Sequence, residues 1–134
     1  NSHMIPGVIR KIHDAKNNKL EFVNIWGDGL ARREFMYAAD FADFIYYAIE
    51  NFFKMPQNIN VGMGFDCSIS EYYKIIAKEI NYHGKFNHDL TKPIGVKEKL
   101  IDNKRLNNFG WTHKTSLKLG IKNTYSFFLK EILY

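Results

Sequence analysis

Residues 68–80 read Ser-Ile-Ser-Glu-Tyr-Tyr-Lys-Ile-Ile-Ala-Lys-Glu-Ile, and this stretch decides the fold class. Ser68 and Glu71 have the spacing of a capping box, in which each side chain accepts a hydrogen bond from the other residue's backbone. Apolar residues follow at helical spacing on one stripe, namely Ile69, Tyr72, Ile76 and Ile80. The pattern predicts an amphipathic helix that packs one face on a core.

Strand signals lie on both sides of this helix. Strands are predicted at Leu20–Trp26 before a Gly27-Asp28-Gly29 turn, at Arg33–Tyr37, at Asn58–Val61 and at Lys85–Leu90. Further helices are predicted over 5–15, after an Asp40 N-cap, from an Asp102 cap to Gly110, and from Ser116 onward. Helices and short strands alternate irregularly, so we expect one mixed α/β domain over 1–134, without the core of a doubly wound sheet.

Composition and charge narrow the class of partner. The chain has 134 residues, of which 46% are hydrophobic and 16% aromatic, as in a globular domain with apolar surface to spare. The net charge of +5 suits a phosphate-bearing ligand, but the 19 Lys and Arg residues are scattered, which argues against nucleic acid. No apolar run has transmembrane length, and Cys67 is the only cysteine. We expect a cytoplasmic protein with no membrane partner.

Several kinds of chemistry have no sequence support. The Gly27–Gly29 turn leads into a predicted strand rather than a helix, and Gly62-Met63-Gly64 lacks a third glycine, so neither predicts a dinucleotide-binding turn. No tyrosine is followed four residues later by lysine, which excludes that acid–base pair from this chain. His83 and His88 are more typical of solvated histidines than of metal ligands, so no metal site is expected.

Two polar side chains at the ends of apolar elements are candidates for binding. Trp26 ends a predicted strand and could stack on a planar ligand, although a core tryptophan is the commoner situation. Arg33 begins the next strand, where its guanidinium could bind a phosphate through two hydrogen bonds. A salt bridge to Glu34 or to another carboxylate is an equal alternative for Arg33.

Read together, these motifs resemble one enzyme family. They run in order as Asn-Ser-His-Met-Ile-Pro (1–6), Trp-Gly-Asp-Gly (26–29), Arg-Glu-Phe-Met-Tyr-Ala-Ala-Asp (33–40), Lys-Pro-Ile-Gly (92–95) and Phe-Gly-Trp (109–111). The chain resembles the carboxyl-terminal, substrate-binding part of the GDP-L-fucose synthases. These are NADPH-dependent 3,5-epimerase/4-reductases of GDP-4-keto-6-deoxy-mannose, in the extended short-chain dehydrogenase/reductase family. The resemblance runs from end to end.

The resemblance assigns functional residues. It implies that His3 is catalytic in epimerisation and contacts the NADP(H) cofactor, which a missing amino-terminal domain mainly binds. It implies that Lys11, Trp26, Arg33 and Lys99 contact the GDP-sugar substrate. Lys11 stands where arginine is usual. The intact enzyme is expected to be a homodimer in polysaccharide precursor synthesis, whereas this chain alone is expected to be inactive.

The resemblance also predicts an exposed surface and one departure. Phe35, Phe41, Phe44 and Phe53 lie where the family joins its two domains, so we expect them to be partly uncovered. Ile94 replaces an aspartate that contacts the substrate sugar in the family. The sugar can therefore differ from that of the GDP-L-fucose synthases. A GDP-4-keto-6-deoxy-heptose enzyme and a non-catalytic nucleotide-sugar-binding module are the alternatives.

Overall fold

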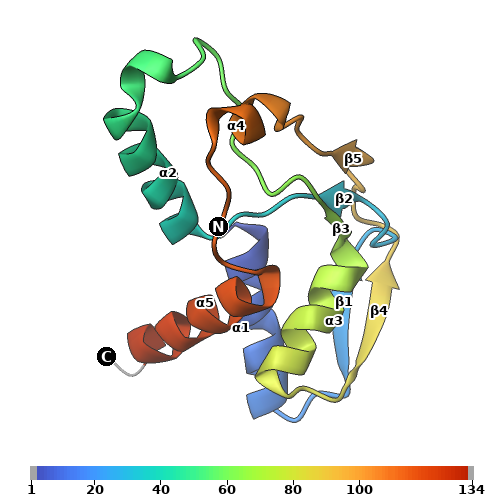
Figure 1. Cartoon of the computed structure of the whole chain (residues 1–134). Coiled ribbons are helices and arrows are strands. Elements are labelled where there is room, and N and C mark those ends of the chain that lie inside the picture. The colour runs from blue at the N-terminus through green and yellow to red at the C-terminus, as the bar shows by residue number, and fades with distance from the viewer. Residues whose placement is uncertain (1–2, 133–134) are drawn as a thin grey trace.

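A computed structural model describes residues 3–132 (Figure 1). The helices are α1 (Met4–Asn17), α2 (Ala38–Glu50), the 3-10 turn η1 (Phe52–Lys54), α3 (Ile69–Ile80), α4 (Lys104–Phe109) and α5 (Leu117–Ile132). The strands are β1 (Phe22–Trp26), β2 (Arg32–Arg33), β3 (Cys67–Ser68), β4 (Lys85–Asp89) and β5 (Glu98–Lys99). Helices alternate with short strands, as the sequence predicts.

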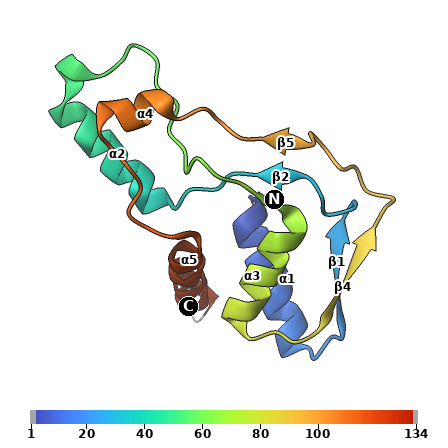
Figure 2. The same ribbon diagram turned by 45° about the vertical axis from the view of Figure 1, so that its right-hand side comes forward.

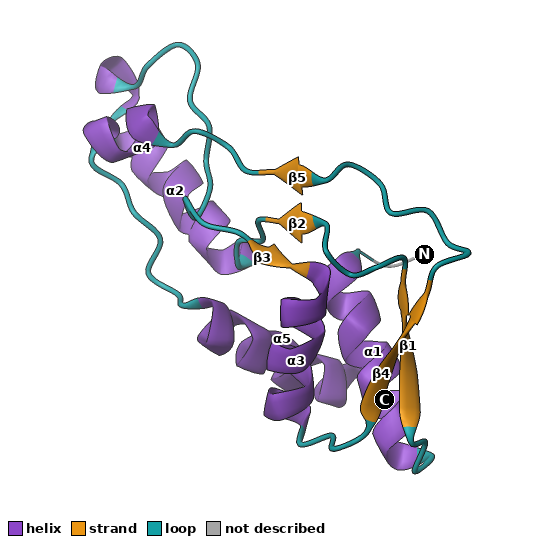
Figure 3. Cartoon of the chain, turned by 90° about the vertical axis from the view of Figure 1, so that its right-hand side faces the viewer, coloured by secondary structure: helices purple, strands orange, loops and turns teal. Residues whose placement is uncertain are grey.

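The strands form two small sheets. β1 and β4 pair in parallel, with Trp26 opposite Asp89 at the end of the ladder. The second sheet has the order β3-β2-β5, in which β2 is antiparallel to β3 and parallel to β5. Figure 3 shows this second sheet between the α2–α4 pair and the body formed by α1, α3, α5 and the β1–β4 pair. It therefore lies where the two parts of the domain meet.

Each part has its own core. The larger core gathers the apolar faces of α1, β1, α3 and α5, and its most deeply buried members are Ile9, Ile12, Ile25, Ile76 and Ile80. The smaller one holds Phe44 and Ala48 of α2 against Leu106 and Trp111. Figure 2 shows α2 and α4 side by side and away from the larger body. The predicted capping box at Ser68 and Glu71 is present and begins α3, which confirms that helix.

One predicted strand is shorter than expected and another is absent. β2 stops at Arg33 instead of reaching Tyr37, because its antiparallel partner β3 is only two residues long and pairs with Arg32 and Arg33 alone. Residues 58–61 form no strand. Their backbone is held by side chains instead, since Arg105 donates to the Asn58 carbonyl and Ile59 packs against the smaller core. The loop after β4 leads into β5, which was not predicted and whose pairing depends on β2 far away in the chain.

Asp40 is not the N-cap of α2. The helix begins at Ala38 after Tyr37, and Asp40 lies in its first turn with 4% of its surface exposed. The Asp40 carboxylate accepts hydrogen bonds from the Thr115 backbone N–H (3.1 Å) and hydroxyl (2.9 Å). It therefore ties α2 to the segment that precedes α5. At α4 the N-cap position is Asn103, but the predicted residue Asp102 supplies the side-chain bond, since its carboxylate accepts from the Lys104 N–H at 2.9 Å.

The apolar residues of α2 do not all face the core. Of the phenylalanines expected to be uncovered, Phe44 is buried, because its ring packs on the edge of Trp111 at a centroid distance of 5.3 Å. Exposed rings and aliphatic chains line the rest of α2 and η1, and we name them the α2 apolar face: Phe41, Ile45, Tyr46, Ile49, Phe52 and Phe53. No helix within residues 3–132 is both long and apolar enough to cross a membrane.

Candidate substrate site

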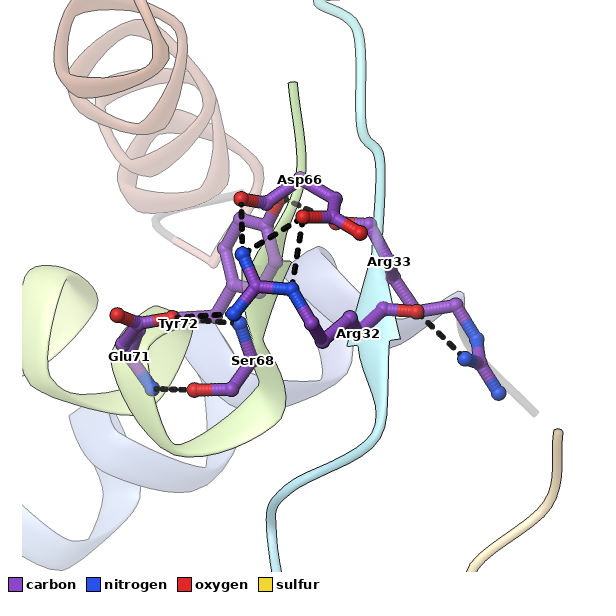
Figure 4. A network of polar contacts seen from close by, with 6 residues as sticks. All are labelled: Arg32, Arg33, Asp66, Ser68, Glu71 and Tyr72. Carbon is purple, nitrogen blue, oxygen red and sulfur yellow. Dashed lines mark hydrogen bonds and ion pairs between the residues drawn. The ribbon is translucent and has the colours of Figure 1, made fainter. Parts of the chain in front are cut away.

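Two adjacent arginines on β2 have different partners (Figure 4). Neighbouring side chains of a strand point to opposite faces of the sheet. Arg32 donates to the Asp66 carboxylate from Nε (2.8 Å) and to the Asp66 carbonyl (2.9 Å), and it also lies 3.7 Å from a Glu71 oxygen. The hydrogen bond to Asp66 raises the pKa of Arg32. This arginine therefore belongs to the scaffold.

Arg33 points the other way in Figure 4. Its guanidinium donates to the backbone carbonyl of Arg32 at 2.6 Å and pairs with no carboxylate in the part of the chain that the structure describes. The Glu34 carboxylate is occupied elsewhere, by the N–H groups of Gly64 (2.7 Å) and Ile101 (3.3 Å). The salt-bridge alternative for Arg33 is therefore wrong, and most of its donors remain available to an anion.

The backbone at Arg33 is held from α3. The Tyr72 hydroxyl donates to the Arg33 carbonyl at 2.9 Å, and only 1% of Tyr72 is exposed. Burial raises the pKa of the Tyr72 phenol, so it remains a hydrogen-bond donor. The Phe35 ring meets the Tyr72 ring edge-on at 5.1 Å. Sequence reasoning placed Tyr72 only in the core, and its position in the apolar stripe gave no signal of this second contact.

Three of the five residues that the resemblance assigns to the site line one cavity. Its volume is about 500 Å³, and His3, Arg33 and Lys99 all border it. Arg33 and Lys99 are register partners in the parallel β2–β5 pair, so their side chains leave the same face of the sheet. His3 reaches the cavity as the N-cap of α1. Two cations and an imidazole thus meet at one hollow, which suits an anionic ligand.

Trp26 lies at the end of β1 beside the loop that contains Ile94. The indole is 63% exposed, so the core alternative is wrong, and the Lys92 ammonium lies 5.9 Å from its ring centroid. Gly27 has φ of +69°, and a Cβ there would lie 3.2 Å from the Ile94 side chain. A Cβ on Gly95 would lie 3.4 Å from the Arg33 guanidinium. The loop that contains Ile94 therefore runs from the exposed indole of Trp26 to the cavity lined by His3, Arg33 and Lys99.

Lys11 does not line this cavity. Its ammonium donates to the Asn24 carbonyl at 2.5 Å and lies 5.9 Å from the Tyr73 ring centroid. Partial burial lowers the pKa of Lys11. Among the described residues, Lys11 is thus engaged with β1 and α3, and the structure does not bring it to Arg33.

A second cavity of about 340 Å³ shares His3 with the first. Phe35 and Met36 border both hollows, and Gly120 of α5 borders the second. Its lining is mainly apolar. Within residues 3–132, no cluster of three or more His, Cys, Asp or Glu side chains could hold a metal ion.

Nor do the described residues offer a turn for the diphosphate of a dinucleotide. Gly27 and Gly29 are followed by β2 instead of a helix, and the first N–H groups of α3 are already occupied there, since Ser70 donates to the Gly29 carbonyl and Ile69 to the Ala31 carbonyl, each at 2.9 Å. Gly62 and Gly64 lie beside Glu34, whose carboxylate would repel a phosphate. The Arg33–Lys99 cavity therefore suits an anionic ligand, whereas neither glycine segment has the arrangement of a dinucleotide-binding turn.

Sequence comparisons identify related proteins. A model of the NAD dependent epimerase/dehydratase family matches residues 1–62. GDP-L-colitose synthase of Yersinia pseudotuberculosis is 59% identical over 131 residues, which are 98% of this chain and 42% of that protein. GDP-L-fucose synthase of Escherichia coli is 38% identical over 139 residues, covering 98% of this chain and 43% of that protein. The chain spans about two fifths of the length of these curated relatives.

Solved structures show the same fold. The GDP-mannoheptose C4 reductase from Campylobacter jejuni with NADP bound matches with a TM-score of 0.84 and 29% identity, over 96% of this chain and 45% of that chain. A GDP-L-fucose synthetase from Naegleria fowleri bound to NADP matches with a TM-score of 0.87 over 98% of this chain and 41% of that chain. At 23% identity the second match concerns the fold alone. Both confirm the predicted mixed α/β fold class.

Proposed function

We propose that this chain belongs to the NAD dependent epimerase/dehydratase family and is the substrate-binding part of a GDP-4-keto-deoxy-sugar 3,5-epimerase/4-reductase. The observation that carries the proposal is the meeting of His3, Arg33 and Lys99 at one cavity of about 500 Å³. A nucleoside diphosphate brings two negative phosphates, and Arg33 and Lys99, which form no ion pair with a carboxylate within residues 3–132, are chemically suited to them. The relatives named as GDP-sugar synthases support guanine as the base.

Each residue has a separate role in this proposal, which follows from the chemistry of its side chain. Arg33 and Lys99 bind the diphosphate, and the exposed indole of Trp26 stacks on a planar or ring-shaped part of the ligand. His3 is the acid–base group, because an imidazole can hold or release a proton near neutral pH. Lys11 is the least supported member, since a substrate contact would require it to leave the Asn24 carbonyl.

NADP(H) supplies the hydride for the reduction when bound. We propose that it binds mainly to parts of the polypeptide other than residues 1–134, with His3 as the one contact from this chain. The 134 residues then form a single nucleotide-sugar-binding domain of a cytoplasmic, homodimeric enzyme of polysaccharide precursor synthesis. On this proposal the chain alone neither binds NADPH tightly nor turns over.

The test is NADPH consumption by the full-length protein with GDP-4-keto-6-deoxy-mannose and related GDP-sugars. We expect turnover that needs both the GDP-sugar and NADPH, and His3→Asn should lower kcat by roughly 10²- to 10⁴-fold, the usual contribution of an acid–base group. Turnover of UDP-sugars in preference to GDP-sugars would contradict the proposal, and so would a His3→Asn variant with unchanged kcat. GDP binding without any turnover would favour the non-catalytic module.

Ile94 bears on which sugar is used. The side chain is 50% exposed and lies against Gly27, next to Trp26. A branched alkyl group accepts no hydrogen bond, so it suits a sugar that lacks a hydroxyl at that point. L-Colitose is a 3,6-dideoxyhexose, and the colitose synthase is 59% identical to this chain. We therefore propose a GDP-4-keto-3,6-dideoxy-sugar substrate rather than the 6-deoxy-mannose derivative. Its C3 is a methylene and not a stereocentre, so with this substrate epimerisation would occur at C5 alone, before reduction at C4.

Ile94→Asp tests the choice of sugar. The wild-type enzyme should use GDP-4-keto-6-deoxy-mannose with a lower kcat/KM than the dideoxy substrate, and Ile94→Asp should narrow that gap. Ile94→Val is the matched control, because it keeps the site apolar and should leave the ratio unchanged. Equal use of both sugars, with no effect of Ile94→Asp, would show that this loop does not set specificity. Preference for a heptose would favour the alternative that the Campylobacter reductase represents.

A further inference from the structure

The Glu34 carboxylate joins two segments, residues 62–64 and 99–101, that flank the cavity lined by His3, Arg33 and Lys99. Its Oε1 accepts a hydrogen bond from the Gly64 N–H at 2.7 Å, and its Oε2 accepts one from the Ile101 N–H at 3.3 Å. Gly62, Lys99 and Ile101 from these two segments border the cavity, as does Glu34 itself. One side chain therefore holds both walls to β2, with one oxygen for each wall.

The Glu34 carboxylate is closely packed by its neighbours. A Cβ on Gly62 would lie 2.5 Å from Glu34 Oε1 and 2.7 Å from Ile101 Cδ1, so even a methyl group at Gly62 would push the two apart. On its other side, the β2 backbone is held by the Tyr72 hydroxyl at the Arg33 carbonyl. The strand that carries Arg33 is thus fixed from α3 and from the cavity walls together.

We propose that Glu34 is a positioning residue for the diphosphate site, which sets the separation of the Arg33 and Lys99 cations; this inference rests on the proposed function. A fixed pair of cations binds a diphosphate better than a mobile pair, because less side-chain and loop freedom is lost on binding. Glu34 acts through Arg33 and Lys99 and does not itself meet the substrate phosphates, which a carboxylate would repel.

Electrostatics alone predicts the opposite result, which makes the proposal testable. Replacing a carboxylate by an amide beside an anion site removes repulsion and should strengthen binding of GDP. The positioning role predicts weaker binding instead. In Glu34→Gln one oxygen becomes an NH₂ group, which cannot accept the second backbone N–H, so one wall is released. Glu98→Gln is the matched control, because it removes the same charge next to Lys99 from an exposed residue of β5.

Isothermal titration of the protein with GDP gives the readout. We expect Glu34→Gln to weaken the affinity roughly tenfold, as for loss of one hydrogen bond to a charged group. Glu98→Gln should keep or slightly raise the affinity. Amide hydrogen exchange should speed up at Gly64 and Ile101 in Glu34→Gln, and a purely electrostatic effect would not change it.

Two further variants keep the test valid if Glu34→Gln does not fold. Glu34→Asp keeps the charge but is too short to reach both N–H groups, and Gly62→Ala separates the walls with Glu34 intact. Both should weaken GDP binding. If the Glu34 variants bind GDP as tightly as Glu98→Gln does, the positioning role is overturned. If Arg33→Ala nevertheless loses GDP binding in that case, the proposed function stands. A wild-type protein that binds no GDP would overturn both.

Discussion

Replacing Arg33 by alanine should weaken binding of the GDP-sugar and leave the fold intact. The guanidinium has one internal hydrogen bond, to the Arg32 carbonyl at 2.6 Å, so its removal costs the folded state little. Its other donors are available to phosphate oxygens beside Lys99. A charge-assisted hydrogen bond contributes about 1.5–3 kcal/mol, which corresponds to a rise of roughly ten- to hundredfold in KM.

The expected pattern is specific to the diphosphate. This group does not react, so Arg33→Ala should raise KM with little change in kcat, which is the signature of lost uniform binding. Steady-state kinetics with varied GDP-sugar at saturating NADPH measures both constants, and a direct titration measures the affinity for NADPH. The NADPH affinity should not change, because on the proposed function NADPH binds mainly outside residues 1–134 and Arg33 is not one of its contacts.

Arg32→Ala is the matched control on the neighbouring residue. It leaves the Asp66 carboxylate, whose side chain is only 7% exposed, without its cation. We expect a lower midpoint of thermal unfolding and less folded protein, whereas the KM of the folded fraction stays unchanged. A rise in KM as large in Arg32→Ala as in Arg33→Ala would refute the division of roles. So would an equal loss of NADPH affinity in Arg33→Ala.

Three other measurements follow from the contacts. Tyr72→Phe removes the hydrogen bond to the Arg33 carbonyl and should lower the free energy of unfolding by about 0.5–1.5 kcal/mol in denaturant titrations, the usual net contribution of one hydrogen bond; unchanged stability would contradict this. The hydrogen bond from Lys114 lowers the pKa of Asp43 in the folded state. The stability that this carboxylate contributes is therefore complete above its unfolded pKa and is lost as pH falls through the lower folded pKa. Asp43→Asn should accordingly make the free energy of unfolding depend less on pH in the acid range. The chain should self-associate with rising concentration in light scattering through the α2 apolar face, and Phe53→Ser should reduce the association; a monomer at all concentrations would contradict this.

Local signals in the sequence predict the helices well. α3 runs from Ile69 to Ile80 behind its capping box, as the spacing of Ser68 and Glu71 predicts. The box and the apolar stripe are contained within the helix itself, so no distant residue has to be known. The N-cap prediction at Asp40 is wrong because a distant segment at Thr115 competes for the same carboxylate.

The site depends on distant partners and is harder to predict. Arg32 and Arg33 are equivalent in the sequence, and the choice between them rests on Asp66, which lies 34 residues further along the chain. The pairing of Arg33 with Lys99 joins segments 66 residues apart by sequence number through strands of two residues, too short for a strand pattern. The resemblance supplied Arg33 and Lys99, whereas nothing in the sequence pointed to Glu34 as a bridge between cavity walls.

The arginine doublet also constrains the length of the chain before it. Surface turns usually tolerate insertions and deletions. Residues 27–31 join β1 to β2, and loss of one residue from this turn, carried into β2, would exchange the two faces of the strand. Arg33 would then take the place of Arg32 at Asp66, and Glu34 would take the place of Arg33 opposite Lys99. Both arginines would still be present in the sequence, so a change of loop length could abolish substrate binding in a homologue that retains every functional residue.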